Sequence, residues 1–338
     1  MAPFILAWEI TKACNLKCIH CRASATKHRD PEELNTQEGY HLLDELACLG
    51  TKMVILSGGE PLLRDDVFDL AHYGSSLGLR MTLATNGSLI TKDAAEKIKA
   101  SRIERVSVSL DGPSADTHDE FRGVKGSFDA AINGIKILKN TGIPVQINTT
   151  VSAVNVRTME KFPEMIEALG AVAWHVFFLV PTGRGQALEL ARIQEYKDML
   201  EKFYIVYKDA KIEAKATCAP QFYRLLAERG EKVVTKGCLA GTGFGFISST
   251  GEVQPCGFLQ ILCGNIRERS FKEIWENSHT LKALRDPDRL KGRCKICAYN
   301  NVCGGCRARA YEVFGDAFGF DPICWYEEVK SEELRVKE

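Results

Sequence analysis

The sequence predicts an α/β fold: a partial (β/α)6 barrel, similar to a TIM barrel, followed by a small cysteine-rich domain. Short apolar runs alternate with helical patterns from residue 4 to about residue 208, which is typical of a parallel sheet with crossover helices. Most of the 13 cysteines lie after residue 237. A chain of 338 residues, 45% of them hydrophobic, is long enough for one large and one smaller domain.

Each expected strand is a short apolar or alternating run bounded by turn residues. The strands are expected at residues 4–11, 53–57, 80–85, 105–110, 145–151 and 174–179. Apolar residues at helical spacing predict helices between them, at residues 36–49, 67–77, 91–100, 128–140 and 160–169. In such a barrel the functional residues lie at the carboxyl ends of the strands.

The expected domains are a barrel core, a linker, an auxiliary domain and a tail. Their expected bounds are residues 1–210 for the core, 211–237 for a linker or helix segment that contains Cys218, 238–330 for the auxiliary domain and 331–338 for the tail.

Charge and cysteine usage limit the class of protein. The formal net charge is zero, so nucleic acid is not an expected partner. The chain shows no signal segment and no apolar run of membrane-spanning length, so we expect a soluble cytoplasmic protein with no membrane partner. In a reducing compartment, cysteines in such number indicate metal binding rather than disulfides.

Three cysteines follow the first expected strand at C-x3-C-x2-C spacing: Cys14, Cys18 and Cys21. A tetrahedral metal prefers four ligands, whereas a [4Fe-4S] cluster held by three thiolates leaves one iron open for a small molecule. A structural zinc site with His20 as the fourth ligand is the alternative.

The cysteine spacing resembles that of the radical S-adenosylmethionine enzymes. The resemblance implies that Cys14, Cys18 and Cys21 hold a catalytic cluster. Reduction of that cluster would cleave S-adenosylmethionine to a 5′-deoxyadenosyl radical, which takes hydrogen from an unactivated C–H bond.

The strand-end loops resemble the cofactor-binding segments of the same family. Alternatives remain for three of them: a simple turn at the paired glycines or at Asn86, and a solvated loop charge at Arg122. The implied contacts are Ser57, Gly58, Gly59, Glu60 and Pro61 with the methionyl amino group, Asn86 at the end of the third strand, Ser109 and Asp111 with the ribose, Arg122 with the carboxylate, Asn148 on the fifth strand, and the backbone around Val176 and Phe178 with the adenine.

The C-terminal cysteines resemble the SPASM domain, which holds two auxiliary [4Fe-4S] clusters. The resemblance implies three clusters in all, with Cys294, Cys297, Cys303 and Cys324 at the outer auxiliary cluster and Cys238, Cys256 and Cys306 at the inner one. Two residues separate Cys303 from Cys306, whereas the family usually has three at this place. The inner set also lacks a fourth cysteine. Cys218 could fill that place, or an iron could stay open for substrate; a pair of zinc ribbons is the alternative to both clusters.

The remaining cysteines, Cys48 and Cys263, are expected in the core. An auxiliary cluster could accept an electron from a substrate radical, which favours net oxidative chemistry. We expect an electron donor such as a ferredoxin or flavodoxin.

Residues 7–25, with Cys21-Arg22-Ala23, and residues 217–220 resemble the radical enzymes of alternative heme and heme d1 synthesis. That subgroup implies oxidative decarboxylation of two propionates of iron-coproporphyrin III, or removal of acetate side chains from didecarboxysiroheme. Arginine suits such carboxylates because its planar fork binds both oxygens, so Arg22, Arg184 and Arg224 are the candidate substrate ligands.

Two other functions fit the same cysteines. One is a peptide maturase that forms thioether or carbon–carbon crosslinks, although the first strand begins too close to Met1 for an N-terminal leader-binding domain. The other is a non-catalytic iron-sulfur electron carrier, which the intact run from Ser57 to Pro61 and Ser109 disfavour.

Overall fold

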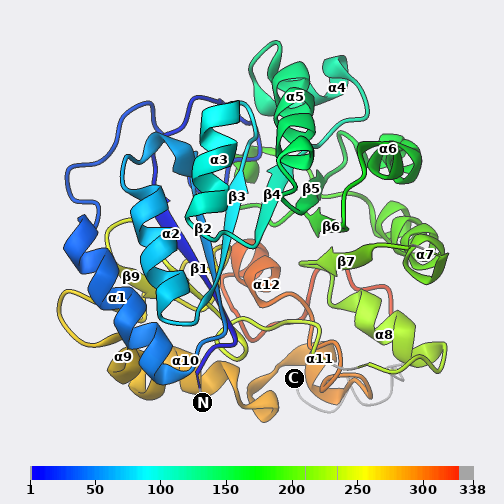
Figure 1. Cartoon of the computed structure of the whole chain (residues 1–338). Coiled ribbons are helices and arrows are strands. Elements are labelled where there is room, and N and C mark those ends of the chain that lie inside the picture. Colours follow the sequence, from blue (N-terminus) through cyan, green and yellow to red (C-terminus); the bar gives the residue numbers. More distant parts are fainter. Residues whose placement is uncertain (1, 210, 234, 327–338) are drawn as a thin grey trace.

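The computed structural model describes residues 2–209, 211–233 and 235–326 and has one curved sheet covered by helices (Figure 1). The expected tail lies outside the described residues. The sheet has ten strands in the order β10-β9-β8-β1-β2-β3-β4-β5-β6-β7. Every neighbouring pair from β8 through β1 to β7 is parallel, so the fold class expected from the sequence is confirmed.

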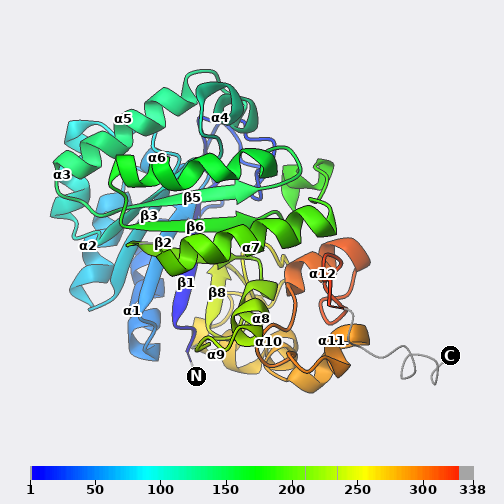
Figure 2. The same ribbon diagram turned by 90° about the vertical axis from the view of Figure 1, so that its right-hand side faces the viewer.

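The six expected strands are all present. They are β1 (Ile5–Thr11), β2 (Met53–Gly58), β3 (Arg80–Thr85), β4 (Arg105–Ser109), β5 (Val145–Val151) and β6 (Ala173–Phe178). The crossover helices are α1 (Thr36–Leu49), α2 (Val67–Ser76), α3 (Lys92–Ala100), α5 (Ser127–Asn140) and α6 (Phe162–Leu169). Figures 1 and 2 show these helices on the outer side of the curved sheet.

Helix α1 illustrates how local sequence sets these bounds. The side chain of Asn35 accepts a hydrogen bond from the amide of Glu38, and the Glu38 carboxylate accepts one from the amide of Asn35. This capping box satisfies two amides that have no partner within the helix. The helix ends at Leu49 and is capped by Gly50, whose φ of 89° suits glycine.

A helix was expected within residues 211–237, and α8 (Gln221–Glu228) lies there, just after Cys218. The sequence does not predict the other elements, which are α4 (Ala115–Arg122), α7 (Ile193–Asp209), β7 (Glu213–Thr217), β8 (Phe244–Ile247), β9 (Glu252–Gln254), β10 (Gly264–Asn265), α9 (Phe271–Asn277), α10 (His279–Leu284), α11 (Gly292–Ile296) and α12 (Arg307–Phe314). Strand β7 lies in the segment expected as a linker and extends the parallel sheet beside β6. Strand β8 pairs with β1, so the sheet runs on across the expected domain boundary at residue 238.

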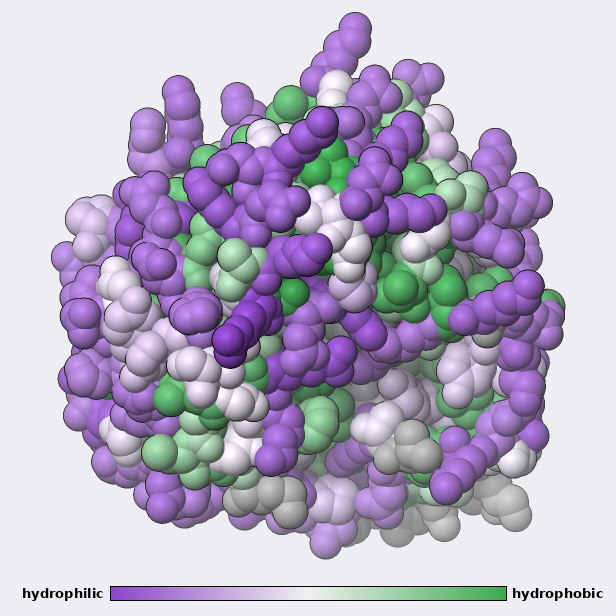
Figure 3. Space-filling model, in the orientation of Figure 1, coloured by the Kyte–Doolittle hydropathy of each residue, from purple (hydrophilic) through white to green (hydrophobic). Residues whose placement is uncertain are grey.

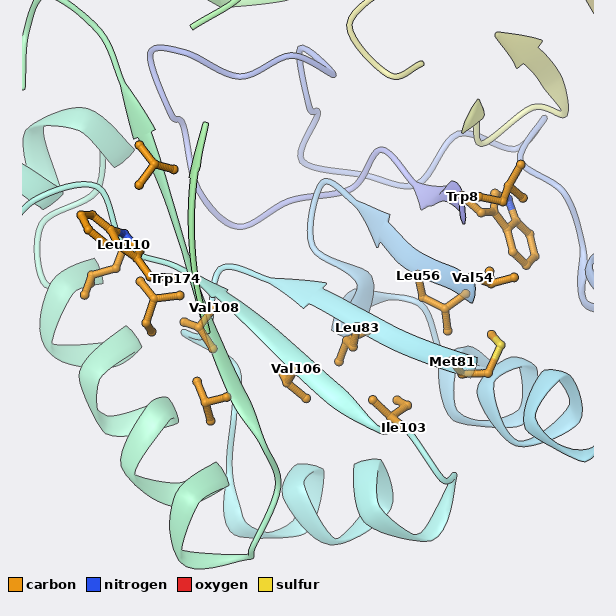
Figure 4. Packing of buried hydrophobic residues seen from close by; sticks show 14 of the residues in the cluster. Trp8, Val54, Leu56, Met81, Leu83, Ile103, Val106, Val108, Leu110 and Trp174 are labelled. Carbon is orange, nitrogen blue, oxygen red and sulfur yellow. The ribbon is translucent and has the colours of Figure 1, made fainter. Parts of the chain in front are cut away.

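The main core lies between the sheet and its outer helices (Figure 4). Leu56, Leu83, Val108 and Trp174 are at most 1% exposed. The intervening residues of these strands face the concave side of the sheet, where many are only half-buried. Because side chains alternate between the two faces of a strand, the sheet has one sealed face and one that stays partly accessible.

The C-terminal elements α9 to α12 lie together beneath the strands (Figure 2). A second, smaller apolar cluster around Leu259, Leu284 and Cys306 packs there. Within the described ranges, each helix is too short or too polar to cross a membrane. On the face shown in Figure 3, apolar side chains form separate patches among hydrophilic ones.

Candidate functional site

The first three cysteines lie in a loop that leaves the carboxyl end of β1. Backbone amides donate to two of their sulfurs: Leu16 to Cys14 and Ala25 to Cys21, each across 3.4 Å. Burial raises the pKa of the Cys14 thiol to about 11, so a bound metal would be needed to keep its thiolate at neutral pH. Amide donors of this kind suit thiolates that bind a cluster.

The sulfur of Cys18 belongs to a buried polar network. Nη1 of Arg122 donates to Cys18 Sγ across 3.6 Å, and Nη2 pairs with Asp111. Asp111 is fully buried and accepts a 2.6 Å hydrogen bond from the amide of Thr150, while His20 Nε2 lies 3.8 Å from its other oxygen. Asp111, the predicted ribose ligand, and Arg122, the predicted ligand of the cofactor carboxylate, are therefore paired with each other.

The charges in this network oppose the cost of burial. Burial raises the pKa of Asp111 and of Cys18, and the positive charge of Arg122 opposes both shifts. Burial also holds the pKa of His20 well below its usual range, so the imidazole is neutral. Among the described residues, Nδ1 of His20 and Nε of Arg122 have no hydrogen-bond partner, which leaves polar atoms beside the cysteines for a bound group.

The paired glycines after β2 bring that loop against the cysteine loop. A Cβ on Gly58 would lie 2.4 Å from the Thr11 carbonyl oxygen, and one on Gly59 would lie 2.3 Å from that of Ala13. The amides of Gly59 and Glu60 donate to these two oxygens, each across 2.8 Å. The glycines are thus required for backbone contact between the two loops.

Glu60 is fully buried and links the ends of β2 and β3 through hydrogen bonds. Its carboxylate accepts hydrogen bonds from the Thr85 hydroxyl at 2.7 Å, the Asn86 amide at 2.8 Å and the Leu62 amide at 3.2 Å. Burial raises the pKa of Glu60, although these bonds favour its charged form. Pro61 begins a short 3-10 turn that aims the Leu62 amide at the carboxylate.

The side chain of Asn86 bonds within the loops. Its Nδ2 donates to Asn15 at 2.9 Å, and its Oδ1 accepts from Ser88. This contact ties the third strand end to the cysteine loop, so the β1, β2 and β3 loops form one assembly.

Other predicted cofactor contacts fall on two faces of the sheet. Ser57, Ser109 and Asn148 are half-buried on the concave face. Val176 and Phe178 are 0% and 3% exposed, in the core beneath the helices. Their side chains point away from the concave face, so only their backbone remains available, as the sequence prediction stated. All these residues stay predicted S-adenosylmethionine contacts.

Two predicted substrate arginines are bound to protein groups near the cysteine loop. Arg22 pairs with buried Glu9 and stacks over Phe246, 4.6 Å from the ring centre. Arg184 donates to the carbonyls of Cys18 at 2.9 Å and Ala25 at 3.0 Å. Both arginines hold the cysteine loop in place, and as substrate ligands they remain predictions.

The four cysteines predicted for the outer cluster line one pocket, namely Cys294, Cys297, Cys303 and Cys324. Arg224, the third predicted substrate arginine, also lines it and is 1% exposed. Its Nη1 lies 3.6 Å from Cys324 Sγ, and its guanidinium stacks over Trp325. The observed contacts of Arg224 are thus with the outer cysteines.

The four cysteines considered for the inner cluster, Cys218, Cys238, Cys256 and Cys306, pack in the smaller apolar cluster. The side chains of Cys218 and Cys306 hydrogen-bond to each other. Burial raises the pKa of Cys256 to about 12. Among the described residues, no group of three or more His, Cys, Asp or Glu side chains is arranged to hold a metal ion, so the ligand sets remain predictions.

Two arginines that the sequence reasoning missed flank the inner cysteines. Arg307 donates through its amide to Cys238 and through Nη2 to Cys294, 3.7 Å away, and so touches both auxiliary sets. Arg309 pairs with Asp321 at 2.9 Å, and both are fully buried. The sequence signal was available, because Arg307 directly follows Cys306 and Arg309 follows two residues later.

Of the two remaining cysteines, Cys263 is buried as expected, whereas Cys48 is exposed. The expectation that Cys48 is a core residue is wrong. It lies near the end of α1, at a position that faces solvent.

Known proteins resemble this chain in both sequence and fold. The radical SAM superfamily matches residues 8–169, and an iron-sulfur cluster-binding domain, SPASM, matches residues 238–307. An AdoMet-dependent heme synthase of Methanosarcina barkeri is 49% identical over 338 residues, which cover 96% of this chain and 97% of that protein. The mycofactocin maturase MftC of Mycolicibacterium smegmatis is 33% identical over 333 residues, with 96% and 83% covered.

The crystal structure of Streptococcus suis SuiB bound to its precursor peptide SuiA has the same fold, with a TM-score of 0.78 at 20% identity, covering 96% of this chain and 76% of that one. The chain therefore belongs to the radical SAM superfamily, in the group whose members carry a C-terminal SPASM domain and include the AdoMet-dependent heme synthases.

Proposed function

We propose that this protein forms heme by converting two propionates of iron-coproporphyrin III to vinyl groups with loss of carbon dioxide. The observation that carries the proposal is the 49% identity to a heme synthase over 96% of the chain. The similarity to a peptide maturase is lower, at 33%. Removal of acetate side chains from a heme d1 precursor or didecarboxysiroheme is the related alternative.

The cofactors are S-adenosylmethionine and [4Fe-4S] clusters, which the two matched domains imply. When bound and reduced, they supply a 5′-deoxyadenosyl radical that can abstract hydrogen from an unactivated C–H bond. Cys14, Cys18 and Cys21 would hold the catalytic cluster, because amides or a guanidinium already donate to their sulfurs. The donor set fits a cluster with one open iron.

The protein's own residues would orient S-adenosylmethionine at the strand ends. The joined loops of β1, β2 and β3 fix the backbone from Ser57 to Pro61 beside the cysteines. Ser109 and Asn148 would face the ribose from the concave side. Arg122 would offer its unpartnered Nε to the cofactor carboxylate while its other nitrogens hold Cys18 and Asp111.

The auxiliary cysteines would hold two further clusters, one in each set. The shared pocket of the outer four supports their grouping, and the contact between Cys218 and Cys306 supports Cys218 as the fourth inner ligand. A substrate that ends as an alkene must lose an electron, and buried cysteine sets beside the barrel suit an acceptor. The physiological donor would be a ferredoxin or flavodoxin in the cytoplasm, where free thiols persist.

The decisive experiment is an anaerobic incubation of the reduced enzyme with S-adenosylmethionine and iron-coproporphyrin III. We expect release of 5′-deoxyadenosine and a porphyrin that has lost two molecules of carbon dioxide and four hydrogen atoms, because each propionate loses its carboxyl group and one C–H hydrogen. Release of 5′-deoxyadenosine with unchanged porphyrin would overturn the heme proposal and favour a peptide substrate. If fully loaded protein released no 5′-deoxyadenosine, the non-catalytic electron carrier would be the remaining function.

A further inference from the structure

Lys215, in the middle of β7, is a half-buried cation. In the structure from residue 2 to 209, 211 to 233 and 235 to 326, its ammonium group makes no hydrogen bond and no ion pair. Burial lowers the pKa of Lys215, opposed by the negative charges of Glu213 and Cys218. Lysine commonly buries its stem and keeps its ammonium group in water, and the ammonium group of Lys215 is not sealed from solvent. It is therefore available to an anion that reaches this position.

The side chain of Lys215 faces the concave side of the sheet. Its neighbour Ala216 is 3% exposed and belongs to the core beneath the helices. Side chains alternate along a strand, so Lys215 points the other way. Its register partner on β6 is His175, another concave-face residue that bonds to Glu213.

The other cations considered for substrate carboxylates are already engaged. Arg22 pairs with Glu9 and Arg184 donates to two carbonyls of the cysteine loop. Arg224 bonds to Glu228 at 3.1 Å beside the outer cysteines. Engaging any of the three with substrate would break contacts that hold the protein together, whereas engaging Lys215 would break none.

The location of Lys215 also suits a substrate anchor. The residue lies three positions before Cys218, which bonds to Cys306 in the inner cysteine set. Strand β7 ends the parallel series that begins, on the other side, with β8 and then β1, which leads into the cysteine loop. A carboxylate held by Lys215 would therefore keep a substrate on the concave face, beside the inner auxiliary site.

We propose that the ammonium group of Lys215 binds a carboxylate of the substrate on the concave face of the sheet. The proposal rests on the proposed function, since iron-coproporphyrin III carries four carboxylates and needs cationic partners. A charge-assisted hydrogen bond in partly desolvated surroundings is stronger than one in water. Lysine also fits a single carboxylate oxygen, because it is a point charge on a flexible stem.

The test compares three variants of the full-length, cluster-loaded enzyme. Lys215→Met removes the charge and keeps the stem, and Lys215→Arg keeps the charge. Lys136→Met, at an exposed position on α5, is the matched control. Absorbance titration with iron-coproporphyrin III, and separately with its tetramethyl ester, measures affinity without turnover. Iron content and the 5′-deoxyadenosine released without porphyrin report on the radical site.

We expect Lys215→Met to weaken binding of the free acid by about 10-fold to 100-fold, the usual range for a charged hydrogen bond. Lys215→Arg should recover most of this loss, and Lys136→Met should bind like the wild type. The ester should bind the wild type and Lys215→Met equally. Iron content and uncoupled release should not change.

Equal affinity of the wild type and Lys215→Met for the free acid would overturn the inference, as would loss of auxiliary iron from Lys215→Met. If the wild type converts the porphyrin but Lys215→Met binds it normally, only the proposed role of Lys215 is contradicted. If the wild type neither binds nor converts the porphyrin, the proposed function fails together with the anchor.

Discussion

Arg122 lies between Cys18 and Asp111, donating to the sulfur of one across 3.6 Å and pairing with the carboxylate of the other. Asp111 is fully buried and Arg122 is 7% exposed. One guanidinium thus contacts both a cysteine of the proposed cluster loop and a carboxylate at the end of β4. Fold stability and the electrostatics of the proposed radical site are therefore expected to depend on the same side chain.

Replacing Arg122 by leucine should lower the free energy of unfolding by about 3–5 kcal/mol, because it leaves the Asp111 carboxylate buried without its partner. Anaerobic urea denaturation measures this change. The double variant Arg122→Leu/Asp111→Leu should recover much of the stability, yet 5′-deoxyadenosine release should stay low. Equal stability of the single variant and the wild type would contradict this account of the pair.

Replacing Cys218 by glycine separates backbone strain from cluster binding. Cys218 has a φ of 57°, which is unfavourable for a non-glycine residue and costs about 1–3 kcal/mol. Glycine removes that strain but also removes a candidate ligand. We expect Cys218→Gly to fold well and to lose iron and sulfide at the inner site, as judged by Mössbauer spectra. Full retention of the inner cluster would mean that its fourth position does not depend on Cys218.

Replacing Arg307 by methionine should make the auxiliary clusters harder to reduce. The side chain of Arg307 donates to Cys294 and its amide donates to Cys238. Hydrogen bonds and positive charge near cluster sulfurs favour the reduced state. Redox titration followed by electron paramagnetic resonance should give a more negative potential, chiefly for the outer cluster. Arg293→Met, at an exposed position beside the same pocket, is the control; equal shifts in both variants would refute a specific role.

Acidification should destabilise the protein through His118. This residue is 1% exposed, its Nδ1 accepts a 3.2 Å hydrogen bond from the Asp111 amide, and burial lowers its pKa to about 3. The folded state therefore favours the neutral imidazole. The contribution of the neutral His118 to the free energy of unfolding is complete above pH 6.5. It is lost as the pH falls toward 3, at up to about 1.4 kcal/mol per pH unit.

Urea denaturation between pH 5.5 and 7.5 checks this dependence. His118→Gln should flatten the slope of the unfolding free energy against pH, whereas His72→Gln, at an exposed position on α2, should leave it unchanged. An unaltered slope in His118→Gln would show that His118 is not the group responsible.

Periodicity was enough to predict the six strands from β1 to β6, because each is an apolar run or an alternation whose core face is nearly fully buried. It did not predict β7, Glu213–Thr217, which has two alanines and no large apolar residue. Strand β8 owes its place to pairing with β1, a long-range contact that local sequence does not reveal.

Cysteine motifs could be recognised in the sequence. The contacts of a single cationic side chain could not, because they depend on the direction in which the fold points it. The four outer cysteines, grouped by the resemblance to the SPASM domain, line one pocket. Residue type alone suggested Arg22, Arg184 and Arg224 as substrate ligands, but each is engaged by protein groups. Lys215 gave no signal, because a single lysine in a strand is ordinarily a solvent-facing residue.

The pairing of β8 with β1, from Ile5 opposite Phe244 to Trp8 opposite Ile247, makes the auxiliary domain hard to detach. Removing residues from 238 onward would strip one neighbour from the first strand of the barrel and expose its hydrogen-bonding edge, which invites aggregation. A shortened chain is therefore a poor minimal enzyme. Evolution or engineering that exchanges the C-terminal module among relatives must transplant a matching sheet edge together with the cysteines.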